Sequence, residues 1–178
     1  FEYWRMFPTL KAAVEENLKV VEDRLRQEYD VVCAGMVDTL DSADMSGRIL
    51  KDGEIDALIV VLGTYVPDFI SMHAINYVRN VPVIVFSIQE RNSINPAEQY
   101  QESLRNSSAM GVAQLTATFR KVGRKCRVVV GCLRDEEAYA RIGKYLRAIQ
   151  AVNSIRESNI GVIGNGFRGA YDLALNTT

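Results

Sequence analysis

The chain has 178 residues, of which 48% are hydrophobic, and this is enough to form one domain with an apolar core. Its formal net charge of -1 gives it no general attraction to nucleic acid or to an anionic membrane surface. No apolar run approaches the ~20 residues that a membrane span requires. Three cysteines without a C-x-x-C pair indicate a reducing compartment, so we expect a cytoplasmic protein with neither a nucleic-acid nor a membrane partner.

In chain order, apolar spacing predicts an alternation of helices and strands. A first helix begins at Pro8-Thr9, where apolar residues recur every three or four positions. Apolar runs predict strands at residues 29–34, 57–62, 83–88, 127–130 and 159–163. The intervening pattern predicts helices after the polar turn at 38–44, over residues 68–79 and 109–122, and after Asp135.

This alternation is typical of an α/β protein with a parallel sheet. We expect a flavodoxin-like three-layer sandwich, in which helices cover both faces of the sheet. In that topology a central strand leads into the first helix, and the residues before Pro8 contain no such strand. The order of elements therefore leads us to expect a further strand before Phe1.

The stretch from Ala57 to Pro67 marks the first candidate site. It contains an apolar strand, then Gly63-Thr64-Tyr65, and then Pro67 at a helix start. Ligands of open α/β sheets bind just beyond the carboxyl ends of such strands. Residues 2–5 are expected in the same crevice, where aromatic rings beside a carboxylate and a guanidinium suit a polyhydroxylated ligand. The same residues also fit a buried aromatic cluster at a domain edge.

Two other patterns permit different sites. Residues 164–169 match G-x-G-x-x-G after a predicted strand, but neither a well-formed helix nor an acidic residue ~20 positions on follows them, which disfavours a dinucleotide site. Asp38, Asp41 and Asp44 are three apart and could hold a metal ion. A helix cap at Asp41 and a first-turn position for Asp44 explain these carboxylates with fewer assumptions.

Several segments carry a resemblance to a known family. They read Gly-Thr-Tyr-Val-Pro at 63–67, Phe-Ser-Ile-Gln-Glu-Arg-Asn at 86–92 and Asn-Ser-Ser-Ala-Met-Gly at 106–111. Val-Val-Gly at 129–131, Asp135, Arg-Ile-Gly at 141–143 and Arg-Ala at 147–148 follow. In order and spacing these segments resemble the N-terminal region of bacterial L-arabinose isomerases, within the wider L-fucose/L-arabinose isomerase superfamily. The resemblance covers nearly the whole chain.

The resemblance implies that residues 1–178 are the single flavodoxin-like N-terminal domain of a larger cytosolic aldose–ketose isomerase, with the catalytic domains after Thr178. It implies dependence on Mn²⁺, whose ligands would lie in those later domains, and a homo-oligomer, often a hexamer. It also implies that this domain lends residues to the active site of a neighbouring subunit but holds no catalytic group. The positions implied to lie nearest the sugar are Glu2, Trp4, Tyr65, Gln89 and Met110.

Met110 departs from the family pattern, because the arabinose enzymes usually carry histidine at this position. A thioether cannot donate a hydrogen bond to a sugar hydroxyl, which favours a deoxy-sugar or otherwise modified substrate over arabinose. Two non-isomerase hypotheses stay open. The chain could be a sugar- or effector-binding module without catalysis, or a nucleotide-binding domain that uses residues 164–169.

Overall fold

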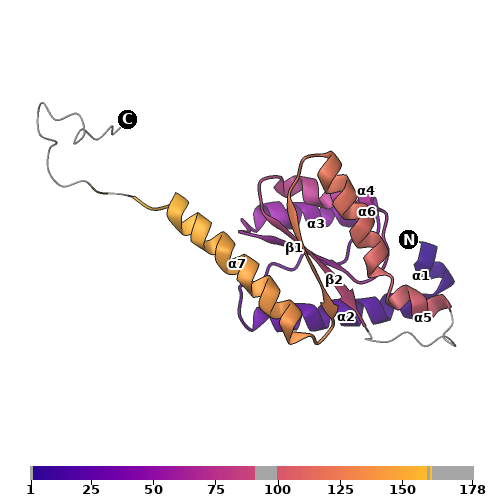
Figure 1. Cartoon of the computed structure of the whole chain (residues 1–178). Coiled ribbons are helices and arrows are strands. Elements are labelled where there is room, and N and C mark those ends of the chain that lie inside the picture. Colours follow the sequence, from indigo (N-terminus) through magenta and orange to yellow (C-terminus); the bar gives the residue numbers. More distant parts are fainter. Residues whose placement is uncertain (1, 91–99, 160, 162–178) are drawn as a thin grey trace, which may run out of the picture.

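The computed structural model describes residues 2–90, 100–159 and 161. Its centre is a three-stranded sheet in the order β1-β2-β3, made of β1 (Leu58–Leu62), β2 (Val83–Gln89) and β3 (Cys126–Cys132) (Figure 1). Both pairs are parallel, with Leu58 opposite Val83 and Val83 opposite Cys126. The chain is therefore a mixed α/β protein with an open parallel sheet, which confirms the predicted fold class and is consistent with a flavodoxin-like sandwich.

Helices come before and after each strand of the described chain. Before β1 lie α1 (Glu2–Met6), α2 (Pro8–Arg26) and α3 (Leu40–Asp52). Between β1 and β2 lie α4 (Asp68–Ile75) and the short 3₁₀ helix η1 (Asn76–Val78), and before β3 lie α5 (Tyr100–Arg105) and α6 (Ser108–Lys121). Last comes α7 (Glu136–Arg156). None of the described helices is both long and apolar enough to cross a membrane.

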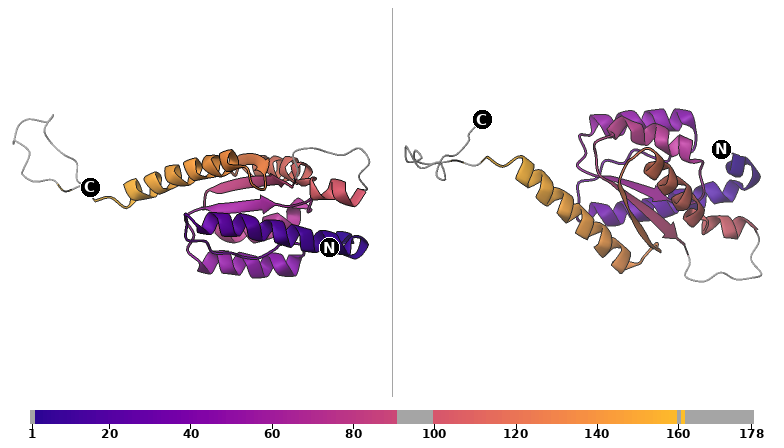
Figure 2. Two further views of the ribbon diagram at one scale, coloured as in Figure 1. Left: turned by 90° about the horizontal axis from the view of Figure 1, so that it is seen from below. Right: turned by 45° about the horizontal axis from the view of Figure 1, so that its top comes forward.

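The two faces of the sheet carry separate apolar cores because β2 alternates its side chains between them. Val83 and Val85 belong to the core under α3, α4 and α6, where Phe119 is fully buried. Ile84 and Phe86 belong to the core under α2 and α7. Figure 1 shows α2 on the side of the strands opposite to α3, α4 and α6. Figure 2 shows that α7 continues beyond the sheet.

The helix starts depend on capping residues, and one of these differs from the prediction. Thr39 caps α3: its hydroxyl accepts a hydrogen bond from the Ser42 amide at 3.1 Å, and the Ser42 hydroxyl accepts one from the Thr39 amide at 2.9 Å. The cap expected at Asp41 is therefore wrong, because Thr39 takes that role and Asp41 lies in the first turn. Asp44 lies one turn further on, where it accepts hydrogen bonds from Tyr77 and Arg48.

The strand expected at residues 29–34 is not formed. After α2 ends at Arg26, residues 30–38 are neither helix nor strand, and Val32 is 40% exposed. A strand is stabilised by hydrogen bonds to a neighbouring strand, and within the described residues the sheet contains only β1, β2 and β3. Apolar composition alone therefore predicted a strand that has no partner there. The strand expected at 159–163 lies largely outside the described residues.

Candidate functional site

A small hollow of about 40 Å³ lies at the carboxyl end of β1. Its lining comes from α1, from α2, from the irregular segment before α3, and from the loop after β1. The lining residues are Trp4, Val14, Met36, Val37, Asp38, Thr64, Tyr65 and Val66. Segments far apart in the sequence thus converge at the position where parallel sheets bind ligands.

Gly63 allows α2 to approach the end of β1 closely. A Cβ atom at this position would lie 2.9 Å from Cγ1 of Val14, which is closer than real side chains approach one another. Val14 belongs to a buried cluster with Leu10 and Leu104, and Trp4 packs against that cluster. A side chain at residue 63 would therefore displace α2 and change the shape of the hollow.

Thr64 ties the loop after β1 to the end of α5 and to Ser107, the residue before α6. This buried hydroxyl donates to the carbonyl oxygen of Leu104 at 2.9 Å and lies 3.2 Å from the hydroxyl of Ser107. Gly111 lies against the same loop, since a Cβ atom there would be 3.8 Å from the carbonyl oxygen of Thr64. The beginning of α6 consequently packs against the loop that lines the hollow.

Trp4 is held in place by Asp38. The indole Nε1–H donates to Oδ2 of Asp38 at 2.7 Å, and the Ser42 hydroxyl donates to Oδ1 of the same carboxylate at 3.1 Å. Next to Trp4, burial and then the neighbouring Tyr100 phenol raise the pKa of the Tyr3 hydroxyl above its ordinary value. The short helix α1 thus places two aromatic side chains at the carboxyl end of the sheet.

A second polar cluster lies where β2 ends. Arg105 donates to the carboxylate of Glu90 through Nε and through Nη2, with both distances 2.6 Å, and Asn17 donates to it through Nδ2 at 3.2 Å. The backbone amide of Glu90 donates to the side-chain oxygen of Asn106 at 2.9 Å. This cluster joins α2, β2 and α5 in one network, which fixes the rim on the side of β2.

The structure brings together some of the predicted site residues but not all. Trp4 and Tyr65 both line the hollow, and Glu2 is the first residue of α1. Gln89 is the last residue of β2 and does not line the hollow. Met110 is 65% exposed on the first turns of α6 and does not line it either, although its neighbour Gly111 contacts the loop after β1.

Sequence reasoning missed the role of two carboxylates. Asp38 was considered only as part of an aspartate triplet, and its bond to Trp4 joins residues 34 positions apart. Glu90 follows a buried strand directly, and an acidic residue at that position was a signal that could have marked it for the rim. The partners of both groups come from other elements, which local patterns do not reveal.

A metal site is not formed by these carboxylates. Among the described residues, no three His, Cys, Asp or Glu side chains gather in a way that could hold a metal ion. Asp38 and Glu90 already accept hydrogen bonds from Trp4, Ser42 and Arg105. The described residues therefore do not fit a Mn²⁺ site.

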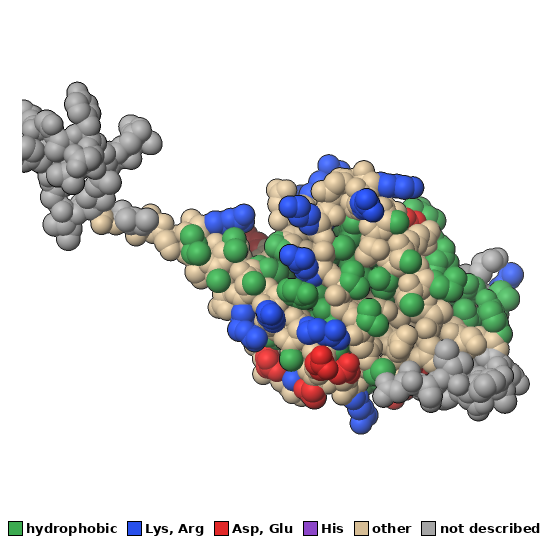
Figure 3. All heavy atoms as spheres, viewed as in Figure 1, with side chains coloured by type: hydrophobic (Ala, Val, Ile, Leu, Met, Phe, Trp, Pro, Cys, Tyr) green, Lys and Arg blue, Asp and Glu red, His purple; other side chains and the backbone are tan. Residues whose placement is uncertain are grey.

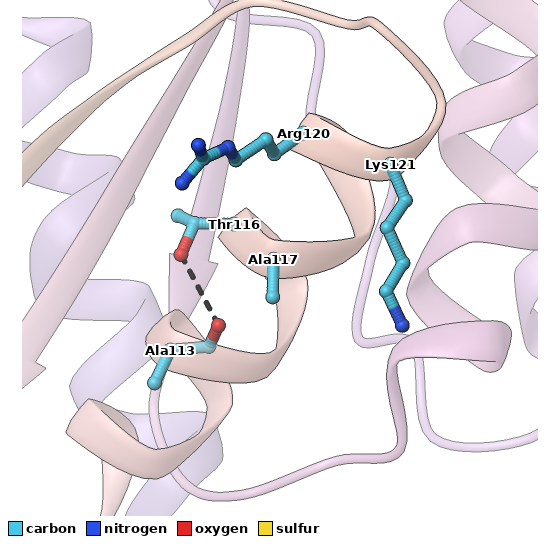
Figure 4. A pocket seen from close by; sticks show the side chains of 5 residues that line it. All are labelled: Ala113, Thr116, Ala117, Arg120 and Lys121. Atoms are coloured by element: carbon cyan, nitrogen blue, oxygen red, sulfur yellow. Dashed lines mark hydrogen bonds between the residues drawn. The ribbon is translucent and has the colours of Figure 1, made fainter.

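A larger trough of about 720 Å³ runs along the outer surface of α6. Figure 4 shows its lining, in which Arg120 and Lys121 extend to either side of Ala113, Thr116 and Ala117. All of these side chains come from one helix, so no second element closes the trough. The Thr116 hydroxyl donates to the carbonyl oxygen of residue 112, within the helix, at 2.7 Å. The hollow at β1, where several segments converge, is the better candidate site.

Comparison with known proteins does not assign this chain to a family. No protein-family model matches the chain, and no curated protein matches it.

Proposed function

We propose that this chain is the substrate-wall and oligomerisation domain of a metal-dependent aldose–ketose sugar isomerase. The observation that carries this proposal is the placement of Trp4 and Tyr65 in one hollow at the carboxyl end of β1. The reaction class is supported by the sequence resemblance, and the geometry supports a role in holding the sugar. The Mn²⁺ ligands implied by the resemblance would be supplied by residues outside this chain.

The side chains in the hollow are suited to a polyhydroxylated ligand. The rings of Trp4 and Tyr65 offer apolar surface to the C–H faces of a sugar, and the Tyr65 hydroxyl can donate or accept a hydrogen bond. An open-chain aldose is flexible, so fixing its orientation increases the fraction of molecules that can react. In the proposed assembly, this wall would face the active site of a neighbouring subunit.

Exposed apolar side chains support the proposed subunit contacts. On β3, Val128 and Val130 are 40% and 48% exposed, and on the projecting part of α7 Ile155 is 74% exposed. Figure 3 shows apolar side chains gathered over the face that carries α6, with Lys and Arg side chains around them. Contiguous exposed apolar surface is a feature of interaction sites. These side chains support the β3 and α6 side of the domain as the proposed oligomer contact.

Ketose formation by the whole protein that contains these residues tests the proposal. With Mn²⁺ present, we expect it to convert one or more of a panel of aldoses that includes L-arabinose and L-fucose. Trp4→Ala should raise KM by about 10-fold or more, because a central aromatic contact is lost, while Phe69→Ala, an exposed change on α4, should leave KM unaltered. Absence of ketose from every aldose with the metal supplied would refute the isomerase assignment.

A stand-alone binding module is the second candidate. The observation that favours it is that residues of this chain alone line the hollow, so part of a ligand could rest against it without another domain. Calorimetric titration of the purified chain with the same aldoses separates the two functions. Binding by the chain, together with no conversion by the whole protein, would favour the module.

Met110→His tests the substrate preference that the sequence indicates. Met110 is exposed on the first turn of α6, next to Gly111, which lies against the loop after β1, and histidine there would add a hydrogen-bond donor for a sugar hydroxyl. We expect the ratio of kcat/KM for L-arabinose to that for L-fucose to rise by about 5- to 10-fold, the effect of one hydrogen bond. Met110→Leu is the matched control and should leave the ratio unchanged. An unchanged ratio in Met110→His would show that residue 110 does not contact the sugar.

A further inference from the structure

The contact between α1 and the segment before α3 is a hydrogen bond in which Trp4 is the donor and Asp38 is the acceptor. The indole of Trp4 directs its N–H at Oδ2 of Asp38, with 2.7 Å between the heavy atoms. Indole nitrogen has one hydrogen and accepts none, so this bond uses the polar atom of the side chain. What Trp4 presents to the hollow is therefore its apolar ring.

Asp38 is fixed independently of Trp4. Its backbone amide donates to the Ser42 hydroxyl at 3.0 Å, and its Oδ1 accepts a hydrogen bond from that hydroxyl at 3.1 Å. Ser42 also completes the capping box with Thr39 at the start of α3. The carboxylate is thus held by the first turn of α3, which gives the indole a rigid partner.

The surroundings of the ring are mostly apolar. The hollow beside it is lined by Val14, Met36, Val37 and Val66. Thr64 also lines it, but its hydroxyl is committed to the carbonyl oxygen of Leu104. The hollow of about 40 Å³ is too small to enclose a sugar, so a sugar at its mouth would meet the indole ring, the Tyr65 side chain and aliphatic side chains.

The geometry points to Asp38 as a positioning residue: by holding the indole N–H, it makes Trp4 a stacking platform for the C–H face of a sugar. This inference rests on the proposed function and specifies how the wall recognises its substrate. Asp38 itself does not react, and it acts through the orientation of Trp4. Loss of the carboxylate would let the indole rotate, which weakens binding without changing the chemical step.

Fluorescence of the purified chain tests this directly, because Trp4 is the only tryptophan in the sequence. Titration with L-fucose and L-arabinose should change the emission of the unmodified chain, whereas glycerol at the same concentrations should not. We expect Asp38→Ala to raise Kd by about 3- to 10-fold, the range for one lost hydrogen bond. Asp38→Asn keeps an acceptor oxygen and should stay within about twofold of the unmodified chain. Asp41→Ala changes an exposed aspartate three residues further on, in the first turn of α3, and is the matched control.

Kinetics of the whole protein give the second readout. Asp38→Ala should raise KM by the same factor and leave kcat within about twofold, since binding alone is weakened. Equal Kd values for Asp38→Ala and the unmodified chain would overturn the inference, as would failure of Asp38→Asn to restore binding. An active isomerase whose sugars leave Trp4 emission unchanged would overturn this inference alone. Absence of both activity and response would overturn it together with the proposed function.

Discussion

Replacing Phe86 with alanine is expected to lower the free energy of unfolding by about 3–5 kcal/mol, because the change leaves a cavity in the centre of the domain. Phe86 is fully buried on β2, the middle strand, and its ring meets that of Tyr139 edge-on with 5.6 Å between centroids. The loss removes both the burial of the ring and this aromatic contact. For a domain of this size, Tm should fall by about 6–20 °C.

Urea denaturation followed by circular dichroism measures this effect. Phe69→Ala makes the same chemical change at a side chain of α4 that is 60% exposed, and it should cost no more than about 1 kcal/mol. The m-value should be the same for both variants and the unmodified chain, so that the midpoints report stability. Similar midpoints for the two variants would mean that β2 is not the centre of the core.

Arg105→Met is expected to have the next largest effect, about 2–3 kcal/mol of unfolding free energy, because it leaves the Glu90 carboxylate without its main partner. The Glu90 side chain is 16% exposed and Arg105 is 26% exposed, so water compensates only in part. Among the described residues, the donor to this carboxylate that would remain is Asn17 at 3.2 Å, a neutral amide and a weaker partner than Arg105.

A double-mutant cycle separates the ion pair from general packing. Arg105→Met combined with Glu90→Gln should recover most of the loss, since no charge is then left unpaired. Arg26→Met is the control, because Arg26 pairs with Glu22 on the exposed side of α2 and should contribute about 0–1 kcal/mol. If the double variant were as unstable as the sum of the single variants, the interaction between Glu90 and Arg105 would be negligible.

The parts of the fold that local signals determine could be predicted from the sequence. Unbroken apolar runs located β1 and β2 within a residue, and the carboxylate of Asp135 marked the start of α7 because it caps the helix by accepting the amide of Glu137 at 3.0 Å. Residues 29–34 show the limit of such signals. A strand depends on a neighbour as well as on its own composition.

The candidate site likewise has residues that could be predicted from the sequence and residues that could not. Trp4 and Tyr65 were predicted in one crevice because parallel topology brings the ends of neighbouring segments together, and both line the hollow. The roles of Asp38 and Glu90 could not be predicted, because each is defined by partners on other elements. The position of Met110 on α6 could be predicted, but its distance from the hollow depends on how that helix packs.

The parallel sheet also bears on the order in which the domain folds. Neither β1 with β2 nor β2 with β3 is joined by a hairpin, since α4 separates the first pair and α6 separates the second. Each pairing therefore closes a long loop before its contacts stabilise it, which makes folding slower than that of a helical bundle of equal length. Because β2 takes part in both pairings, its docking is the step that the two halves of the chain share.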